Sequence, residues 1–231
     1  RSDLYTYFYL KSLNLLNSGG THIFICSNSW LDAGYGAWMQ EFLLSRVAMD
    51  FIIDNHCKRS FSSSAINTVI TVFDAPLKKV GEDFTVKFVA FKKPFEQTVI
   101  TENLLDIKQT REIIKRDDFR VYPITFGKLW QAGIEYKQKK NTTEIKYIGD
   151  KWGGKYLRAP DIFFTILEKG KDKLAKLKDV ADVRRGITTG CNEFFYLTKQ
   201  QAEKWDIEDE FLKPVIKSPR ESKGVIIDPD K

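Results

Sequence analysis

The sequence predicts an α/β fold, and three observations support this prediction. Segments with apolar residues at helical spacing alternate with short apolar segments rich in β-branched residues, in the order helix, strand, helix, strand, loop, strand. The chain has 231 residues, of which 42% are hydrophobic, so it can bury one sizeable core and a further small unit. Its aromatic share of 13% argues against disorder.

The first elements follow from spacing and from residues that begin and end helices. A helix is expected over residues 1–18, because Asp3 is a suitable N-cap and Gly19 and Gly20 end the apolar repeat. Residues 21–27 (THIFICS) then read as an apolar strand of the kind found in parallel sheets that are buried on both faces. The next expected elements are one helix and two strands: residues 37–44, 49–53 and 65–73.

The later elements are less regular. A strand, a helix, a hairpin or linker, a second helix and a last strand are expected in this order: residues 84–91, 101–115, 136–150, 160–169 and 194–197. Pro160 suits the first turn of its helix. Because a sheet does not begin with a lone crossover helix, we expect earlier strands to be missing from this chain.

Composition excludes several classes of protein. The sequence has no apolar run of about 18 residues, so we expect no membrane association. Cys26, Cys57 and Cys191 lie far apart and form no Cys-x-x-Cys pair, and with only His22 and His56 beside them we expect no metal site. Three thiols without a disulfide framework indicate a cytoplasmic protein.

Positive charge is concentrated after residue 75, where 32 of the 37 lysines and arginines lie. The second part of the chain therefore has the composition of a surface that binds a polyanion, although many soluble proteins carry a similar bias.

The stretch Gly149–Lys155 (GDKWGGK) fits the spacing of a phosphate-binding loop, but its context disfavours one. Tyr156 stands where such a loop needs Ser or Thr to hold magnesium, Trp152 crowds the loop, and Pro160 interrupts the following helix. The stretch is better interpreted as a basic, aromatic loop that contacts nucleic acid, or equally as a solvated linker. Three of its cations are candidates for phosphate contacts: Lys151, Lys155 and Arg158.

Two further basic segments each have a structural and a functional interpretation. Arg184, Arg185 and Asn192 lie in a turn bracketed by glycines, which can either read DNA or simply satisfy its own backbone. The polar loop that contains Lys58, Arg59 and Phe61 carries a single aromatic residue, which can either stack on an unpaired base or close the end of the sheet.

Several segments, taken in order, resemble the N6-adenine DNA methyltransferases of type IIG restriction–modification systems, which carry TaqI-like specificity domains. The resembling segments are SDLYTYF at 2–8, LLNSGG at 15–20, FICSNSWL at 24–31, Phe61 with the strand at 65–73, KWGGKYLRAP at 151–160, VRRGITTGCNEFFY at 183–196 and LKPVIKSPR at 212–220. Residues 76–147 resemble nothing that we can name.

The resemblance implies a more specific architecture. It implies the second half of a Rossmann-like methyltransferase sheet, followed by the start of a mixed α+β target-recognition domain. Residues 1–115 would be the C-terminal half of the catalytic domain, residues 116–165 a connecting region, and residues 166–231 the beginning of the specificity domain. The family's glycine-rich cofactor loop and its Asn-Pro-Pro-Tyr motif are not in this sequence. We therefore expect no catalytic residue here and no methyl transfer by the chain alone.

The resemblance also implies residue roles. Phe8 matches the aromatic residue that packs on the adenine ring of S-adenosylmethionine, and Phe61 matches the one that stacks on the flipped target adenine. Double-stranded DNA is the implied partner. The candidate DNA-binding residues are Lys58, Arg59, Lys151, Lys155, Arg158, Arg184, Arg185 and Asn192. The alternative hypothesis is a non-catalytic specificity or scaffold module of a phage-defence complex.

Overall fold

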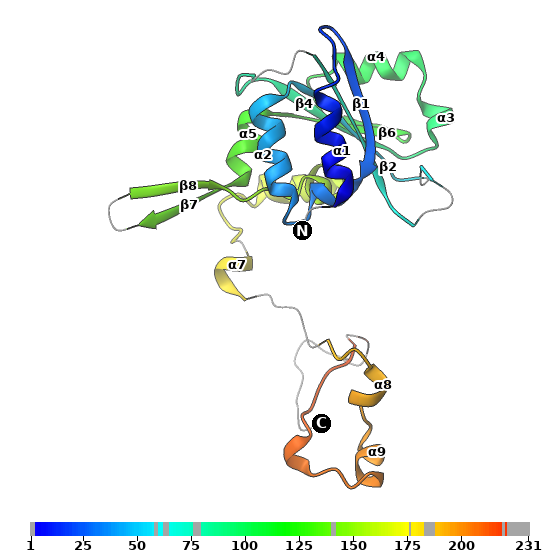
Figure 1. The fold of residues 1–231 in the computed structure, drawn as a ribbon, viewed down its shortest axis with the longest axis vertical. Helices are drawn as coiled ribbons and strands as arrows, with labels where there is room; N and C mark the ends of the chain where they lie inside the picture. The colour runs from blue at the N-terminus through cyan, green and yellow to red at the C-terminus, as the bar shows by residue number, and fades with distance from the viewer. Residues whose placement is uncertain are drawn as a thin grey trace. The chain divides into compact units, whose positions relative to one another are not determined.

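The computed structural model describes residues 3–57, 60–61, 65–75, 80–139, 142–175, 177–182, 188–218 and 220. The chain divides into two compact units, Arg1–Gly170 and Lys171–Lys231, which are described separately below (Figure 1).

The first unit contains a six-stranded mixed sheet, which confirms the predicted α/β class. Its strand order is β1-β3-β2-β4-β6-β5. The strands are β1 (Thr21–Ser27), β2 (Met49–Asn55), β3 (Thr68–Asp74), β4 (Thr85–Phe91), β5 (Ile114–Lys115) and β6 (Phe119–Thr125). β2 and β4 pair in parallel, whereas the other neighbours pair antiparallel. β1 and β2 are both antiparallel to β3, so β1, β2 and β4 all end at the same edge of the sheet.

Helices cover both faces of this sheet (Figure 1). One face packs against α1 (Leu4–Leu13), α2 (Gly36–Arg46), α5 (Phe126–Gly133) and the π-helical turn η2 (Gly153–Arg158). α4 (Thr101–Gln109) covers the other face, preceded by the short α3 (Phe95–Thr98). β4 shows the division residue by residue, because Phe88 and Ala90 belong to the first cluster and Val89 and Phe91 to the second.

The first helix begins as predicted but ends earlier. The Asp3 carboxylate accepts a hydrogen bond of 2.7 Å from the amide of Leu4, so Asp3 is the N-cap. α1 ends at Leu13 rather than at residue 18. The Ser12 hydroxyl donates to the Tyr9 carbonyl within the last turn, which is the backbone competition typical of serine.

The prediction that β1 lies in a parallel, doubly buried sheet is wrong. Among the described residues β1 pairs only with β3, and it pairs antiparallel. Its side chains alternate accordingly: His22 and Cys26 are buried, whereas Ile23 is 67% exposed and Ile25 also faces outward. The prediction failed because a central strand and an edge strand with one exposed apolar face can both carry apolar residues on their two faces.

The middle of the chain contains elements that the sequence did not reveal. β6 and α5 lie within residues 116–165, the expected connecting region, and β6 is a full member of the sheet. The expected hairpin is present as β7 (Ile134–Lys139) paired with β8 (Thr142–Tyr147). The helix expected over 101–115 ends at Gln109. α6 (Asp161–Lys169) begins directly after Pro160, close to its predicted start.

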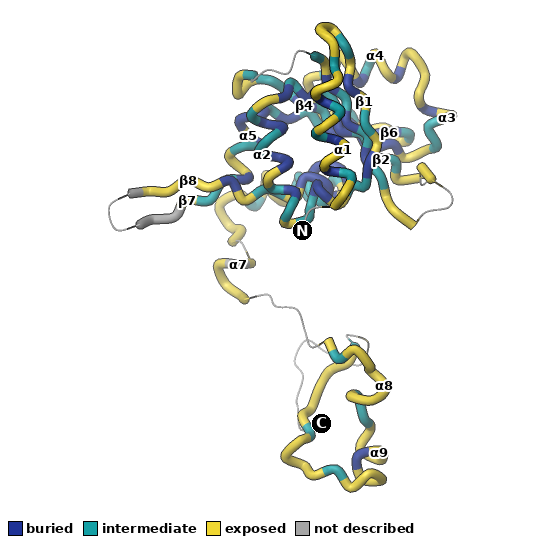
Figure 2. Tube along the Cα trace, viewed as in Figure 1, coloured by how far each residue is buried: buried dark blue, intermediate teal, exposed yellow. Residues whose placement is uncertain are grey.

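The second unit contains short helical elements: α7 (Leu177–Val180), α8 (Asn192–Phe195), α9 (Lys199–Lys204) and the 3₁₀ turn η3 (Asp209–Phe211). Its described part has no strand. The strand expected over 194–197 is wrong, because the Cys191 carbonyl accepts from the amides of Phe194 and Phe195 and closes a helical turn. Most of the described residues of this unit are exposed (Figure 2). No helix among the described residues of the chain has the length and apolar character to cross a membrane.

Candidate functional site

A hollow of about 670 Å³ opens at the edge of the sheet where β1 ends. Its walls come from the start of α1, the end of β1, the turn after it, and the segment that leads into β3. The lining residues are Asp3, Tyr5, Cys26, Ser27, Asn28, Ser29, Phe61, Ala65, Ile66, Asn67 and Thr68. This volume lies in the range of small-molecule sites, which is about 300–1,000 Å³.

Phe61 lies on the wall of this hollow and is 48% exposed. The Ser60 and Thr68 hydroxyls are 2.7 Å apart, and the backbone amide of Asn28 donates to the Asn67 carbonyl at 3.0 Å, so Ser60 and Asn67 both contact the sheet edge. A half-exposed ring on the wall of a hollow can offer a flat face to a ligand. Its role as a stacking residue stays a prediction.

Polar groups share the wall with this ring. The Ser27 and Ser29 hydroxyls are 2.8 Å apart, and Ser29 also donates its amide to Ser27 Oγ. Burial raises the pKa of the Cys26 thiol to about 12, so this thiol stays protonated near neutral pH and is not a nucleophile. The arrangement is suited to binding through hydrogen bonds and ring contacts. Among the described residues no cluster of three His, Cys, Asp or Glu side chains could hold a metal ion.

Asp54 and His56 stand at the same edge, where β2 ends. Asp54 is buried, and burial raises the pKa of its carboxyl group against the opposing effects of His56 and Arg158. The two side chains are 3.8 Å apart, and burial lowers the pKa of His56. The sequence analysis missed this pair. A charged residue near the end of an apolar strand, as in FIIDNH, is the signal that could have indicated it.

Phe8 lies on α1 and is 63% exposed. The α1 side of the hollow is formed by Asp3 and Tyr5 and not by Phe8. The Tyr5 hydroxyl is held 2.8 Å from that of Tyr35, and burial raises its pKa. The structure therefore separates the two predicted aromatic contacts: Phe61 lines the hollow, and Phe8 is exposed on α1 and does not line it.

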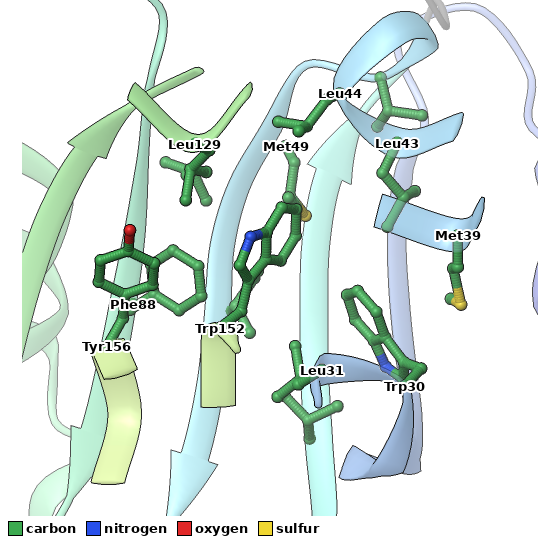
Figure 3. Packing of buried hydrophobic residues seen from close by; sticks show 14 of the residues in the cluster. Trp30, Leu31, Met39, Leu43, Leu44, Met49, Phe88, Leu129, Trp152 and Tyr156 are labelled. Carbon is green, nitrogen blue, oxygen red and sulfur yellow. The ribbon is translucent and has the colours of Figure 1, made fainter. Parts of the chain in front are cut away.

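The stretch Gly149–Arg158 is neither an exposed aromatic loop nor a solvated linker. Trp152 is fully buried, and its ring lies edge-on to Trp30 and Phe88, with centroids 5.9 Å from each (Figure 3). Tyr156 is buried as well, packed against Phe88 at 4.9 Å. The aromatic residues expected to contact nucleic acid are thus core residues, and the sequence pattern could not distinguish the two because both favour large flat side chains.

The same stretch forms a helical turn fixed by Asp32. One oxygen of Asp32 accepts the amide of Gly154 at 2.9 Å, and the other accepts from Arg158. A Cβ at Gly153 would approach this carboxylate to 2.6 Å, so a larger residue there would displace the Asp32 side chain. Gly153 and Gly154 thus lie in a helical turn that the Asp32 carboxylate holds.

The predicted DNA-binding cations of this stretch have partners within the protein. Lys151 donates to the carbonyl of Asp32, and Arg158 pairs with the carboxylate of the same residue. Lys155 pairs with Asp150 at 3.2 Å. All three remain at least partly exposed. They hold the stretch in place, and their contact with DNA stays a prediction.

The other predicted DNA-binding residues are in two groups. Lys58, Arg59, Arg184 and Arg185 lie outside the described residues. Asn192 begins α8 in the second unit, where its side-chain oxygen accepts from the Thr189 hydroxyl at 2.6 Å.

Family models match both ends of the chain. Residues 1–61 match the Eco57I restriction-modification methylase, and residues 149–231 match the C-terminal domain of the type II methyltransferase M.Eco57I. The chain is also 26% identical over 222 residues to the type II methyltransferase M.AccI of Acinetobacter calcoaceticus, covering 96% of this chain and 35% of the relative.

The chain is homologous to the type II DNA methyltransferases of restriction–modification systems. A second relative, the type II methyltransferase M.BstVI of Geobacillus stearothermophilus, is 22% identical over 234 residues, covering 98% of this chain and 36% of the relative. The chain thus spans about a third of the length of these methyltransferases.

Solved structures of related systems are more distant. The type IIG restriction endonuclease BpuSI has a TM-score of 0.46 and 15% identity, covering 91% of this chain and 23% of that one. A modification subunit of a type I enzyme from Vibrio vulnificus has a TM-score of 0.36 and 15% identity, covering 59% of this chain and 28% of that one.

The two matched stretches contain most of the segments that the sequence resemblance used, but the strand at 65–73 lies outside both. The first ends at Phe61, and the second begins at Gly149. Residues 62–148 match neither family model, and they include β4, β6 and the hairpin. The part of the chain that resembled nothing we could name therefore completes the sheet between two family-specific segments.

Proposed function

We propose that this chain is part of an adenine-specific DNA methyltransferase of a restriction–modification system, and that its hollow beside β1 receives the flipped target adenine. The observation that carries the proposal is Phe61, a half-exposed ring on the wall of the hollow, at the end of the stretch matched to the methylase family. An enzyme that modifies a base must extrude it from the duplex, and the extruded base needs a flat partner.

The polar side of the hollow supports the same proposal. Ser27, Asn28 and Ser29 line the hollow together with Phe61; the two serine hydroxyls are 2.8 Å apart, and the Asn28 side chain hydrogen-bonds to Asp54. Hydroxyl and amide groups donate and accept hydrogen bonds, so they can recognise the polar edge of a purine. In this proposal Phe61 stacks on the base and the wall after β1 orients its edge.

S-adenosylmethionine is the methyl donor that the methyltransferase family implies, and it would supply the methyl group, which is carried on its positively charged sulfur. The described residues fit this cofactor at one point. Phe8 presents an exposed ring on α1, next to the residues that line the hollow, and such a ring can pack on the adenine part of the donor.

Double-stranded DNA is the proposed partner, and the cytoplasm, where such DNA lies, is the proposed location. Arg158, Lys151 and Lys155 are cations near the sheet edge that carries the hollow, and Asn192 is exposed in the second unit. We propose that these residues contact phosphates and bases, together with Lys58, Arg59, Arg184 and Arg185.

Product analysis of the full-length protein that carries this chain tests the proposal. Unmodified genomic DNA is incubated with the protein and S-adenosylmethionine, digested to nucleosides, and examined by mass spectrometry for N6-methyladenine. We expect N6-methyladenine and no methylcytosine. Site-specific DNA binding without any methylated nucleoside would instead support the non-catalytic specificity module, and a methylated cytosine would contradict the adenine assignment.

A further inference from the structure

A second hollow, of about 260 Å³, opens at the same edge of the sheet, where β2 and β4 end. His56 follows β2 and Lys92 follows β4, and the parallel pairing of these strands brings both residues to one edge. The His56 amide donates to the Phe91 carbonyl at 2.8 Å, which fixes the two strand ends together. The opposite wall is formed by the chain from Leu157 to Asp161.

Arg120 holds this wall in place. It is only 6% exposed, and its guanidinium donates to the carbonyls of Leu157 and Ala159, both at 2.6 Å. It also pairs with Asp161 at 3.1 Å. These contacts occupy Arg120, so its contribution to the hollow is a fixed positive charge and a fixed wall. The same contacts place Arg158 and the start of α6 at the rim.

Lys92 and Arg158 have donors to offer a ligand. The Lys92 ammonium group carries three N–H bonds, and its described contact is a single one, to the Arg116 carbonyl at 2.7 Å. Arg158 pairs with Asp32 through one nitrogen, and its side chain is 41% exposed. Both residues line the hollow, and their side chains have further N–H groups for an oxygen ligand.

The residues that line the hollow carry more positive than negative charge, although Arg158 is paired with Asp32 just outside the lining. Asp54 adds a buried carboxyl group 3.8 Å from His56. Lys92, Arg120 and Arg158 contribute three permanent cations, against the one carboxylate of Asp161 among the lining residues. Asp161 is itself an anion bound at this place, on Arg120 and in the first turn of α6. Its carboxylate weakens the attraction of the hollow for a second anion.

His56 responds to the same positive charges. Burial lowers its pKa most, and Arg120, Arg158 and Lys92 lower it further, whereas Asp54 opposes them. An anion bound between these cations and His56 would cancel part of this effect and raise the pKa of His56.

We propose that the hollow between His56, Lys92 and Arg158 binds a phosphate group. The group can belong to the DNA backbone or to a free inorganic anion. Assignment to DNA rests on the proposed function. β1 and β2 are separated by β3, so their ends lie about 10 Å apart. The backbone of a strand whose base occupies the first hollow therefore passes within reach of the second.

The two histidines of the chain make the test direct. The pKa values of His56 and His22 are followed by NMR in the 231-residue chain, alone, with inorganic phosphate, and with a short DNA duplex. We expect the pKa of His56 to rise while that of His22, buried elsewhere under α1, stays unchanged. A response to inorganic phosphate supports a general phosphate site, and a response to DNA alone supports a backbone site.

Matched variants locate the effect. Lys92→Gln should weaken phosphate binding about tenfold, because one charge-assisted contact is lost. Lys93→Gln removes the same charge from the neighbouring exposed residue, which does not line the hollow, and should change little. Asp161→Asn should strengthen binding. Equal effects of the two lysine variants, or no shift of His56 with either ligand, would overturn the proposal. The test involves no methyl transfer, so failure of the methyltransferase proposal would not affect it.

Discussion

Replacement of Phe61 by alanine in the full-length protein separates a stacking role from a structural one. Full burial of a phenylalanine side chain contributes about 1.5–3 kcal/mol, and Phe61 is 48% exposed, so Phe61→Ala should cost about 1 kcal/mol of stability. Loss of a stacked base costs about 1–3 kcal/mol, which corresponds to roughly a 5- to 150-fold slower methyl transfer. Phe61→Trp keeps a flat ring and should retain most of the activity.

The assay measures methyl transfer and the melting temperature on the same preparations. Leu105→Ala is the matched control, because Leu105 is 49% exposed on α4, which covers the opposite face of the sheet from α1. It should change stability by a similar amount and leave activity unchanged. If Phe61→Ala lowers the melting temperature sharply and leaves the activity per folded molecule intact, the stacking argument is wrong and Phe61 has a structural role.

Three further predictions follow from burial and charge. Trp152→Ala should lower the free energy of unfolding by about 3–5 kcal/mol in urea titrations, whereas Trp38→Ala, at a residue that is 53% exposed, should have a much smaller effect. With a pKa of about 12, buried Cys26 should resist a thiol reagent at pH 8 in the native chain, while the exposed Cys57 and Cys191 react, as counted by the absorbance of the released thiolate. Burial lowers the pKa of His22, so this histidine binds a proton more readily in the unfolded state, and the free energy of unfolding should fall as the pH drops below about 6.5. His22→Phe should flatten this pH dependence, measured by urea titrations between pH 7.5 and 5. An unchanged slope would contradict the prediction.

Local spacing predicted most elements of the fold but not their pairing. The ranges of β1, β4 and α6 agree closely with expectation, because apolar runs, caps and Pro160 act within a few residues. β1 lies at the edge because β3 pairs between β1 and β2, and this pairing joins residues that are far apart in the sequence. β6 was missed because Arg120 and Pro123 interrupt its apolar pattern, and Arg120 is tolerated there only because carbonyls some 40 residues away receive its N–H groups.

Some residues of the candidate site could likewise be predicted from the sequence, and others could not. Phe61 could be found from the sequence because a lone aromatic in a polar loop is unusual, and its place on a wall of the first hollow depends on nearby turns. Trp152 was assigned to the surface, since large rings serve both cores and nucleic-acid contacts. The cations near the Asp54–His56 pair could not be found, because their proximity to it requires the sheet.

The two hollows have a common structural origin. β1, β2 and β4 point the same way, so the loops that follow them meet at one edge, although Asn28, His56 and Lys92 are far apart in the sequence. Residues that follow strands lie outside the core and can therefore be polar, and several such residues lie at this edge. β3, the antiparallel strand between β1 and β2, sets the separation of the hollows. One edge can therefore hold an aromatic wall for a base and a cationic wall for a phosphate, about two strand spacings apart.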